Sequence, residues 1–260
     1  MIVAGVDGGS RAVKAVLLDA DSDLVLASGE RDQSVHHEQI ARDLLGELLE
    51  KKGLGMNDVK RIVATGYTRN LLRFAQTMVT EITCHAQGVR RQHPDARTIV
   101  EVGGQDSKLL RLHEDGSVRD FQMNDRCAAG TGRFLEMVSV RLETSLEELG
   151  AMAARAATRS AISSMCVVFA ESEIIGLLAS GVPPEEIAAG IQQAVATRVA
   201  MLAGRAATPP VYFTGGVARI SGMDNALSEA FGHPVQVARE PHLTGALGAA
   251  LIAARQARGG

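Results

Sequence analysis

The sequence predicts an α/β protein made of two similar halves. Apolar strands alternate with segments of helical spacing, and no low-complexity linker interrupts them. The opening AGVDGGSRAVKAVLLDADSDLV also matches the pattern of the later VEVGGQDSKLLRLHEDGSV. Both stretches contain a strand, a Gly-Gly turn, a polar residue, a lysine, a returning strand and an acidic turn. This repeat at the level of a hairpin indicates two α/β halves that meet around a ligand.

The first half is predicted to span residues 1–93. Its apolar runs predict short strands at residues 2–9, 12–18, 24–28 and 60–64. Apolar residues at helical spacing predict helices at residues 40–52, near 71–76 and at 82–91. The turn-rich sequence His93-Pro94-Asp95 then marks the boundary between the halves.

The second half is predicted to span residues 94–260. It repeats the strands, at residues 98–102, 107–112, 211–213 and 235–237. Helices are predicted after Cys127, after Cys166, and at residues 145–152, 183–199, 224–231 and 242–255. The last helix, about 242–256, is expected to pack back on the first half.

Composition limits the classes of function. The chain has 260 residues, of which 46% are hydrophobic, and a net charge of −3 from 27 basic and 30 acidic side chains. That balance, without a basic run, argues against nucleic-acid binding. The opening MIVAGVDGG has no basic leader region, and the apolar runs are too short or too interrupted to span a bilayer. Three cysteines do not make a disulfide framework, so a reducing cytoplasm is the expected location.

Three strand-to-Gly-Gly turns are the main candidates for ligand binding. They are Asp7-Gly8-Gly9-Ser10, Gly103-Gly104-Gln105-Asp106 and Thr214-Gly215-Gly216-Val217. Glycine lets the backbone approach a phosphate closely, and N–H groups of a turn can then bind the anion. One such pair alone would be an ordinary turn, whereas three after apolar strands predict nucleotide binding. The P-loop GxxxxGK[ST] and the dinucleotide fingerprint GxGxxG are absent.

Individual side chains near these turns have expected roles. Asp7, at the end of its strand, is a candidate ligand of Mg²⁺, directly or through water, because hard cations prefer carboxylate oxygen. Lys14 is expected near phosphate. Gln105 and Asp106 are candidates to orient a water molecule or bind metal.

Two cysteines form a second group of candidates. Cys127, in NDRCAAGTGRFLE, and Cys166, in SSMCVVFAESE, each precede a segment of helical spacing. Backbone N–H groups at a helix start favour a thiolate, which suggests metal or redox chemistry. The alternative is that both are small buried hydrophobic residues. Cys84 is predicted to be a packed core thiol.

Taken together, these motifs resemble a known family. The hairpin phosphate turns look like those of the actin, sugar-kinase and heat-shock-chaperone ATPase superfamily. Within it, NDRCAAGTGRFLE, SSMCVVFAESE, EVGGQDSK, ATGYTRN and FTGGVA resemble the activators of 2-hydroxyacyl-CoA dehydratases and the ATPase subunits of benzoyl-CoA reductases. The resemblance implies a duplicated actin-like, ribonuclease-H-like ATPase fold, with two similar halves around a nucleotide cleft.

The resemblance also implies a homodimer that shares one 4Fe–4S cluster. Such a cluster normally takes four thiolates, and Cys127 and Cys166 supply two per chain. They are 166 − 127 = 39 residues apart, so the fold must bring them together. The family's activity is ATP hydrolysis that drives a low-potential electron from the cluster into a 2-hydroxyacyl-CoA dehydratase, with ferredoxin or flavodoxin as the donor.

Several positions match the family's nucleotide site. Asp7, Gln105 and Asp106 match the region of Mg²⁺ and γ-phosphate, and Gly8, Gly9, Ser10 and Lys14 belong to the first phosphate turn. Gly103 and Gly104 form the second turn. Gly215, Gly216 and Val217 match the adenosine side, with Gly245 nearby. Relatives commonly carry a small or hydroxyl residue where Arg11 stands, which puts phosphate contacts or hydrolysis there in question.

Two alternative functions stay open. One is the ATPase subunit of a benzoyl-CoA-type or double-cluster reductase, which shares these motifs. The other is a small-molecule kinase of the same superfamily, without a cluster and with a base that activates its substrate.

Overall fold

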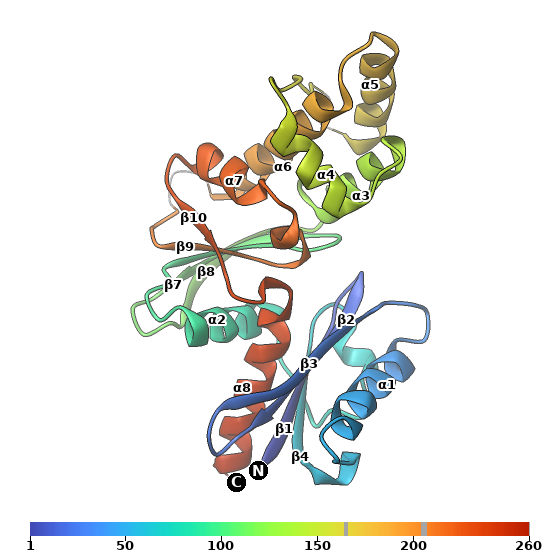
Figure 1. Cartoon of the computed structure of the whole chain (residues 1–260). Helices are drawn as coiled ribbons and strands as arrows, with labels where there is room; N and C mark the ends of the chain where they lie inside the picture. Colours follow the sequence, from blue (N-terminus) through green and yellow to red (C-terminus); the bar gives the residue numbers. More distant parts are fainter. Residues whose placement is uncertain (164–165, 204–206, 260) are drawn as a thin grey trace. The chain divides into compact units, whose positions relative to one another are not determined.

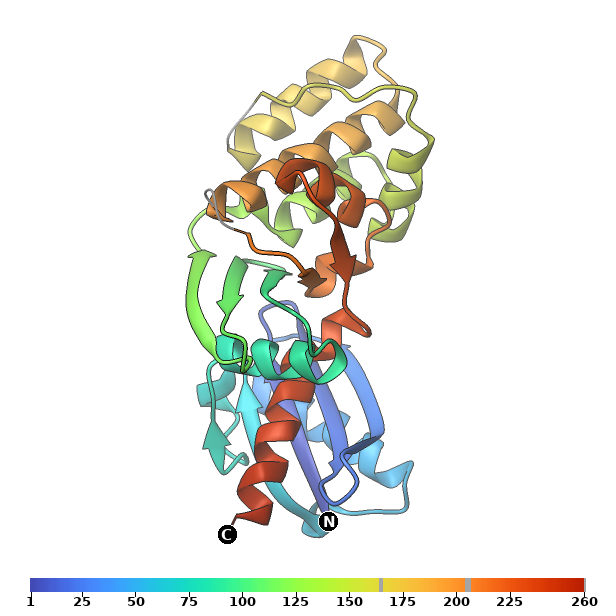
Figure 2. The ribbon, with the colours of Figure 1, turned by 90° about the vertical axis from the view of Figure 1, so that its left-hand side faces the viewer.

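The computed structural model describes residues 1–163, 166–203 and 207–259 (Figures 1 and 2). The chain divides into two compact units. Unit 1 consists of Met1–Asp95, Asp115–Val118 and His242–Gly260, and unit 2 of Ala96–Glu114 and Arg119–Pro241. Ser164 and Met165 of the second cysteine motif lie outside the described residues.

Unit 1 is built on a mixed five-stranded sheet in the order β3-β2-β1-β4-β5. Its strands are β1 (Ile2–Gly8), β2 (Ala12–Asp19), β3 (Leu24–Asp32), β4 (Val59–Thr65) and β5 (Thr77–Met78). The first three strands pair antiparallel, whereas β4 runs parallel to β1 and β5 parallel to β4. The carboxyl ends of β1 and β4 therefore lie at the same edge of the sheet.

Helices cover both faces of this sheet. They are α1 (His37–Glu50), α2 (Glu81–Gln92) and α8 (Thr244–Arg258). Strand residues alternate between two apolar clusters, since Val3 packs with α8 and Ala4 with α1. In Figure 2, α8 runs along the sheet and beside α2. The first and last segments of unit 1 thus share one core.

Glycines allow α8 to approach its neighbours at backbone distance. A Cβ on Gly248 would lie 1.8 Å from the carbonyl oxygen of Cys84 in α2. A Cβ on Gly5 in β1 would lie 2.1 Å from the carbonyl oxygen of Ala246 in α8. Any side chain at these positions would force the helix away from the sheet, which explains why small residues fill this layer.

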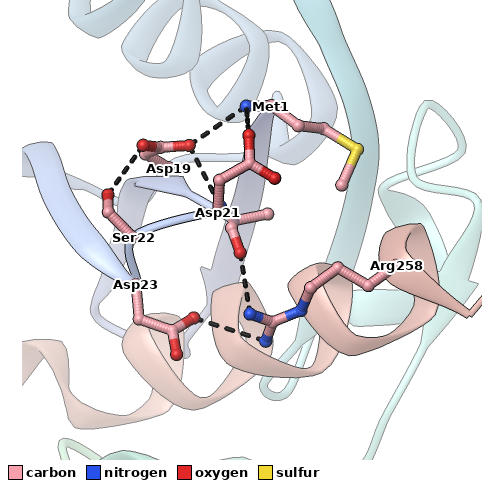
Figure 3. A network of polar contacts seen from close by, with 7 residues as sticks. Met1, Asp19, Asp21, Ser22, Asp23 and Arg258 are labelled. Carbon is pink, nitrogen blue, oxygen red and sulfur yellow. Dashed lines mark hydrogen bonds and ion pairs between the residues drawn. The ribbon is translucent and has the colours of Figure 1, made fainter.

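The turn between β2 and β3 binds both ends of unit 1 (Figure 3). The Met1 ammonium donates to Asp19 at 3.0 Å and to Asp21 at 2.5 Å. Hydrogen bonds from the Ser22 hydroxyl, the Asp21 N–H and the Met1 ammonium lower the pKa of Asp19 to about 2. Near the end of α8, Arg258 donates to a backbone carbonyl of the same turn at 2.8 Å.

Unit 2 repeats the sheet of unit 1. Its strand order is β10-β9-β6-β7-β8, which read backwards is the order of unit 1. The strands are β6 (Thr98–Val102), β7 (Ser107–Leu112), β8 (Val118–Asn124), β9 (Val211–Thr214) and β10 (Val235–Val237). As in unit 1, the first two strands pair antiparallel and the outer pair runs parallel to the first. The duplication expected from the hairpin repeat is therefore present.

Five further helices complete the described part of unit 2. They are α3 (Gly132–Arg141), α4 (Leu146–Arg155), α5 (Val167–Ala179), α6 (Pro184–Ala203) and α7 (Met223–Phe231). Phe134 and Leu135 of α3 join Phe213 of β9 in one apolar core. The predicted cap of α4 is present, since the Ser145 hydroxyl accepts from the Glu148 N–H at 3.1 Å.

Two sequence predictions were wrong or incomplete. Residues 71–76 do not form a helix, because the Gln76 side chain and N–H bond both backbone groups of Ile62 and lead the chain into β5. Strand β8 was not predicted, because it is half-exposed and mostly polar. Within the described residues, no helix is long and apolar enough to cross a membrane.

Candidate functional site

The first Gly-Gly turn brings together an acid, a glycine and a lysine in unit 1. Asp7 is buried near the end of β1, and Lys14 stands directly opposite it on β2. Lys14 Nζ lies 3.9 Å from Asp7 Oδ2, and a Cβ on Gly9 would lie 3.0 Å from that same nitrogen. Arg11, at the tip of the turn, is exposed and pairs with Asp32 at 3.2 Å. The ammonium group of Lys14 therefore stands beside the turn, as the sequence predicted.

The ATGYTRN loop supports this turn from below. The Thr68 N–H and hydroxyl both donate to the Gly8 carbonyl, at 2.8 and 3.1 Å. Gly66 has φ +88°, and a Cβ there would lie 2.2 Å from Asp7 Oδ1. A Cβ on Gly245 would lie 3.0 Å from Asp7 Oδ2. Bare backbone thus approaches the Asp7 carboxylate from two sides, which fixes where its oxygens point.

The thiol of Cys84 lies behind the same turn. It is fully buried, and burial raises the pKa of the Cys84 thiol to about 12. The neighbouring His85 is also buried, and its Nδ1 lies 2.9 Å from the Thr244 hydroxyl. The prediction that Cys84 is a packed core thiol is confirmed.

The second Gly-Gly turn is held by a buried lysine in unit 2. Lys108 Nζ lies 2.9 Å from Glu101 Oε2 and 2.8 Å from Asp106 Oδ2, and only 1% of the side chain is exposed. The Gly103 N–H donates to the Asp106 carbonyl at 2.9 Å, which closes the turn. Gln105 is exposed at the tip. The turn is therefore a rigid unit whose outer side chain faces solvent.

Glu101 was missed as a site residue. It pairs with Lys108 across β6 and β7 in the register that joins Asp7 to Lys14 across β1 and β2. The spacing is equal, since 108 − 101 and 14 − 7 are both 7. Aligning the two lysines of the hairpin repeat would have placed Glu101 opposite Asp7 and revealed it.

The third Gly-Gly turn lies next to the second. Parallel pairing of β6 and β9 sets Thr214 beside Glu101. Gly215 has φ +94°, and a Cβ there would lie 2.3 Å from the Val102 carbonyl oxygen. A Cβ on Gly216 would meet nothing within 4 Å, so that face of the turn is open. Unit 2 therefore joins Gly103 to Asp106 with Gly215, Gly216 and Val217 at one sheet edge.

Cys127 and Cys166 are both exposed and both precede helical segments. Cys127 comes before the single 3₁₀ turn Ala128–Gly130, and α3 begins only at Gly132. Cys166 directly caps α5, where its carbonyl accepts from the Ala170 N–H at 2.9 Å. The alternative that both thiols are buried hydrophobic residues is therefore wrong.

The side chain of Asn124 holds Cys127 by its backbone. Asn124 Oδ1 accepts from the Cys127 N–H at 3.1 Å, and Asn124 Nδ2 donates to the Cys127 carbonyl at 2.7 Å. The side chain of Asn124 was not singled out from the sequence, although it opens the quoted cysteine motif. Further along, the ion pair of Arg141 with Glu171 joins α3 to α5. The elements that follow the two cysteines are thus packed together.

The sequence signature of the BadF/BadG/BcrA/BcrD ATPase family matches residues 4–253. The chain belongs to this family. The resemblance inferred from the motifs is confirmed, and the fold class of actin-like ATPases is confirmed with it.

Members of this family include close relatives of the chain. It is 41% identical over 259 residues to the 2-hydroxyisocaproyl-CoA dehydratase activator of Clostridioides difficile, covering 99% of this chain and 97% of the relative. It is 42% identical over 254 residues to the activator of lactoyl-CoA dehydratase of Anaerotignum propionicum, covering 97% of each. The solved Clostridium difficile activator with bound ADPNP has a TM-score of 0.95 at 40% identity, covering 100% of this chain and 96% of that chain.

Within this family's fold, the described residues of one chain contain no group of three or more His, Cys, Asp or Glu side chains placed to hold a metal ion. The two exposed cysteines supply soft sulfur donors. Asp7 supplies a hard oxygen donor beside the first turn. The donor chemistry therefore separates into a thiolate pair in unit 2 and a carboxylate in unit 1.

Proposed function

We propose that the chain hydrolyses ATP to drive a low-potential electron from a 4Fe–4S cluster into a 2-hydroxyacyl-CoA dehydratase. The observation that supports this most is the pair of exposed thiols at helix starts in unit 2. The segment after the first thiol hydrogen-bonds the second Gly-Gly turn. A kinase of the same fold has no need of such thiols. The family's activators of acyl-CoA dehydratases agree with this function.

In this proposal the Gly-Gly turns bind the nucleotide. Their glycines let backbone N–H groups approach phosphate oxygens, and Lys14 adds a positive charge beside the first turn. The buried Asp7 carboxylate would hold Mg²⁺, directly or through water. Exposed Gln105 would orient the attacking water, and Asp106 would support it from the base of the turn. The open Gly216 face would accept the adenosine side.

Cys127 and Cys166 would hold the cluster. Both thiols are exposed, and the N–H groups of the helical segments behind them stabilise negative charge on sulfur. When bound, the cluster supplies a one-electron carrier. Since a cluster of this kind takes four thiolates, a second copy of the chain would supply the other two.

The exposed face of α5 supports such a homodimer. Val168 and Phe169 directly follow Cys166 and are 67% and 69% exposed, and Ile175 is 51% exposed. Large apolar side chains in a contiguous exposed patch mark an interaction surface. A second copy that shares the cluster would cover this face of α5.

The dehydratase partner is proposed only as a class. The chain is almost equally similar to activators named for a 2-hydroxyisocaproyl and for a lactoyl substrate. Because the acyl group varies while this identity does not, we assign the choice of acyl group to the partner. A cytoplasmic ferredoxin or flavodoxin would supply the electron. The second candidate, a benzoyl-CoA-type reductase subunit, belongs to the same matched family.

Anaerobic reconstitution with iron and sulfide tests the cluster. The wild-type protein should become brown and contain about four iron atoms per dimer. Cys127→Ser and Cys166→Ser should each lose the visible absorbance, because a thiolate ligand is removed. Cys84→Ser is the matched control and should keep it, because that thiol is buried in unit 1. A colourless wild-type protein that still binds ATP would refute the proposal.

A further inference from the structure

The second Gly-Gly turn is hydrogen-bonded to the first residues of α3. The Gly103 carbonyl accepts from the Gly132 N–H at 2.9 Å, and the Gly104 carbonyl accepts from the Arg133 N–H at 2.9 Å. The first N–H groups of a helix have no partner inside the helix. Here the turn that carries Gln105 supplies those partners.

The opposite edges of the same peptide units are available to a ligand. The Gly103 carbonyl shares a peptide unit with the Gly104 N–H, and the Gly104 carbonyl shares one with the Gln105 N–H. Within the described part of the chain, neither of these N–H groups donates to a protein acceptor. A peptide unit is planar and moves as one body. When phosphate turns the N–H edge, the carbonyl edge that holds α3 must turn with it.

Close packing leaves little room for this motion to be absorbed. A Cβ on Gly132 would lie 3.0 Å from the Gly103 oxygen and 3.3 Å from the Gly104 Cα. Before Gly132, the Thr131 N–H and hydroxyl both donate to the Ala128 carbonyl, at 3.1 and 2.8 Å. The stretch from Ala128 to Gly132 is therefore a stiff connection.

The far end of this connection is Cys127, held by Asn124. Both backbone groups of Cys127 bond the Asn124 amide, at 3.1 and 2.7 Å. A Cβ on Gly130 would lie 3.3 Å from Asn124 Nδ2, so the clamp and the turn are in contact. Beside Gly130, the Ser107 hydroxyl is buried and lacks a partner among the described residues. A small shift of the turn could give it one.

We propose that Asn124 is a positioning residue through which phosphate on the Gly103-Gly104 turn sets the orientation of the Cys127 thiol. The path runs from the two peptide units through Gly132 and the Ala128 turn to the clamp, wholly inside unit 2. The proposal rests on the proposed function in one respect, that this turn binds nucleotide phosphate. It does not depend on the cluster or on the dehydratase.

The reactivity of Cys127 measures the coupling without a cluster. The full chain carrying Cys166→Ser leaves Cys127 as the one exposed cysteine, since Cys84 is buried. Its alkylation by iodoacetamide is followed with and without Mg²⁺ and a non-hydrolysable ATP analogue. Nucleotide should change the rate at least about fivefold, the lower end of usual coupling between sites. Asn124→Ala should remove this dependence and leave nucleotide affinity, measured by calorimetry, within about twofold.

Two further variants make the result decisive. Asn225→Ala replaces an exposed asparagine of α7 in the same unit and should keep the full nucleotide response. Gly132→Ala, which crowds the Gly103 carbonyl, should weaken the response by a second route and decides the case if Asn124→Ala is unstable. Nucleotide binding with an unchanged Cys127 rate, or a full response in Asn124→Ala, would overturn the coupling alone. A parent chain that binds no nucleotide would overturn the proposed function as well.

Discussion

The hairpins β1–β2 and β6–β7 have the same register but hold their lysines differently. In each, an acid near the end of the first strand faces a lysine on the second, Asp7 with Lys14 and Glu101 with Lys108. Lys14 Nζ is 3.9 Å from its acid, and 16% of the side chain is exposed. Lys108 Nζ is 2.9 Å from its acid, and 1% is exposed. One hairpin leaves its lysine near the surface, whereas the other locks it inside.

A single position explains the difference. Asp106 stands two residues before Lys108 and binds it at 2.8 Å, whereas Ala12 stands two residues before Lys14. Without a second carboxylate, Lys14 lacks the paired oxygens that hold Lys108 and can turn toward an incoming anion. The same hairpin therefore supplies a ligand-binding lysine in unit 1 and a structural one in unit 2.

The largest expected effect is on stability. Lys108→Met removes the charge between two carboxylates, one of them buried, and should lower the free energy of unfolding by about 3–5 kcal/mol. Lys14→Met should cost under about 1 kcal/mol, because its ion pair is long and partly exposed. Urea unfolding of both variants measures the two values. Equal losses would show that the two lysines have the same role.

A second effect concerns what lies behind the acid of the first hairpin. Cys84 has its pKa raised from 9.0 to about 12, so between these values the unfolded thiol ionises while the folded one stays neutral. Its contribution is complete below pH 9 and falls by about 1.4 kcal/mol per pH unit above it. The stability advantage of wild type over Cys84→Ala should therefore shrink by roughly 2–3 kcal/mol from pH 9 to 11. A constant advantage across this range would contradict a neutral buried thiol.

The smallest effect is on nucleotide affinity. Lys14→Met should raise the dissociation constant for ATP about tenfold, which corresponds to about 1.4 kcal/mol, through loss of one charge beside phosphate. Lys14→Arg, which keeps the charge, is the control and should recover most of the affinity. Calorimetry with Mg²⁺ and a non-hydrolysable analogue gives both constants. An unchanged constant in Lys14→Met would place phosphate away from this lysine.

Local patterns in the sequence identified most of the strands and all three Gly-Gly turns. These features depend on apolar periodicity and on glycine, which act within a few residues. Glu101 was missed because an acid near a strand end is ordinary, and only its partner 7 residues later marks it. Asn124 was missed because its contribution lies in two bonds to the Cys127 backbone.

The segment after Leu71 shows the same limit in the fold. Its composition permits a helix, yet Gln76 bonds both backbone groups of Ile62, which is distant in sequence. Such tertiary bonds outweigh the weak preference of a short segment. The half-exposed strand β8 failed for the opposite reason, since its side chains carry little apolar signal.

The position of α8 in the chain affects the order of biosynthesis. Its backbone lies against Gly5 of β1, but it is translated only after the main segment of unit 2. Residues 96–241 number 146, so at usual elongation rates the ribosome needs roughly 7–30 s to cross them. Throughout that interval the α8 face of the first sheet, with Val3 and Val63, has no covering helix. The nascent chain therefore carries an unfinished first unit while it completes the second.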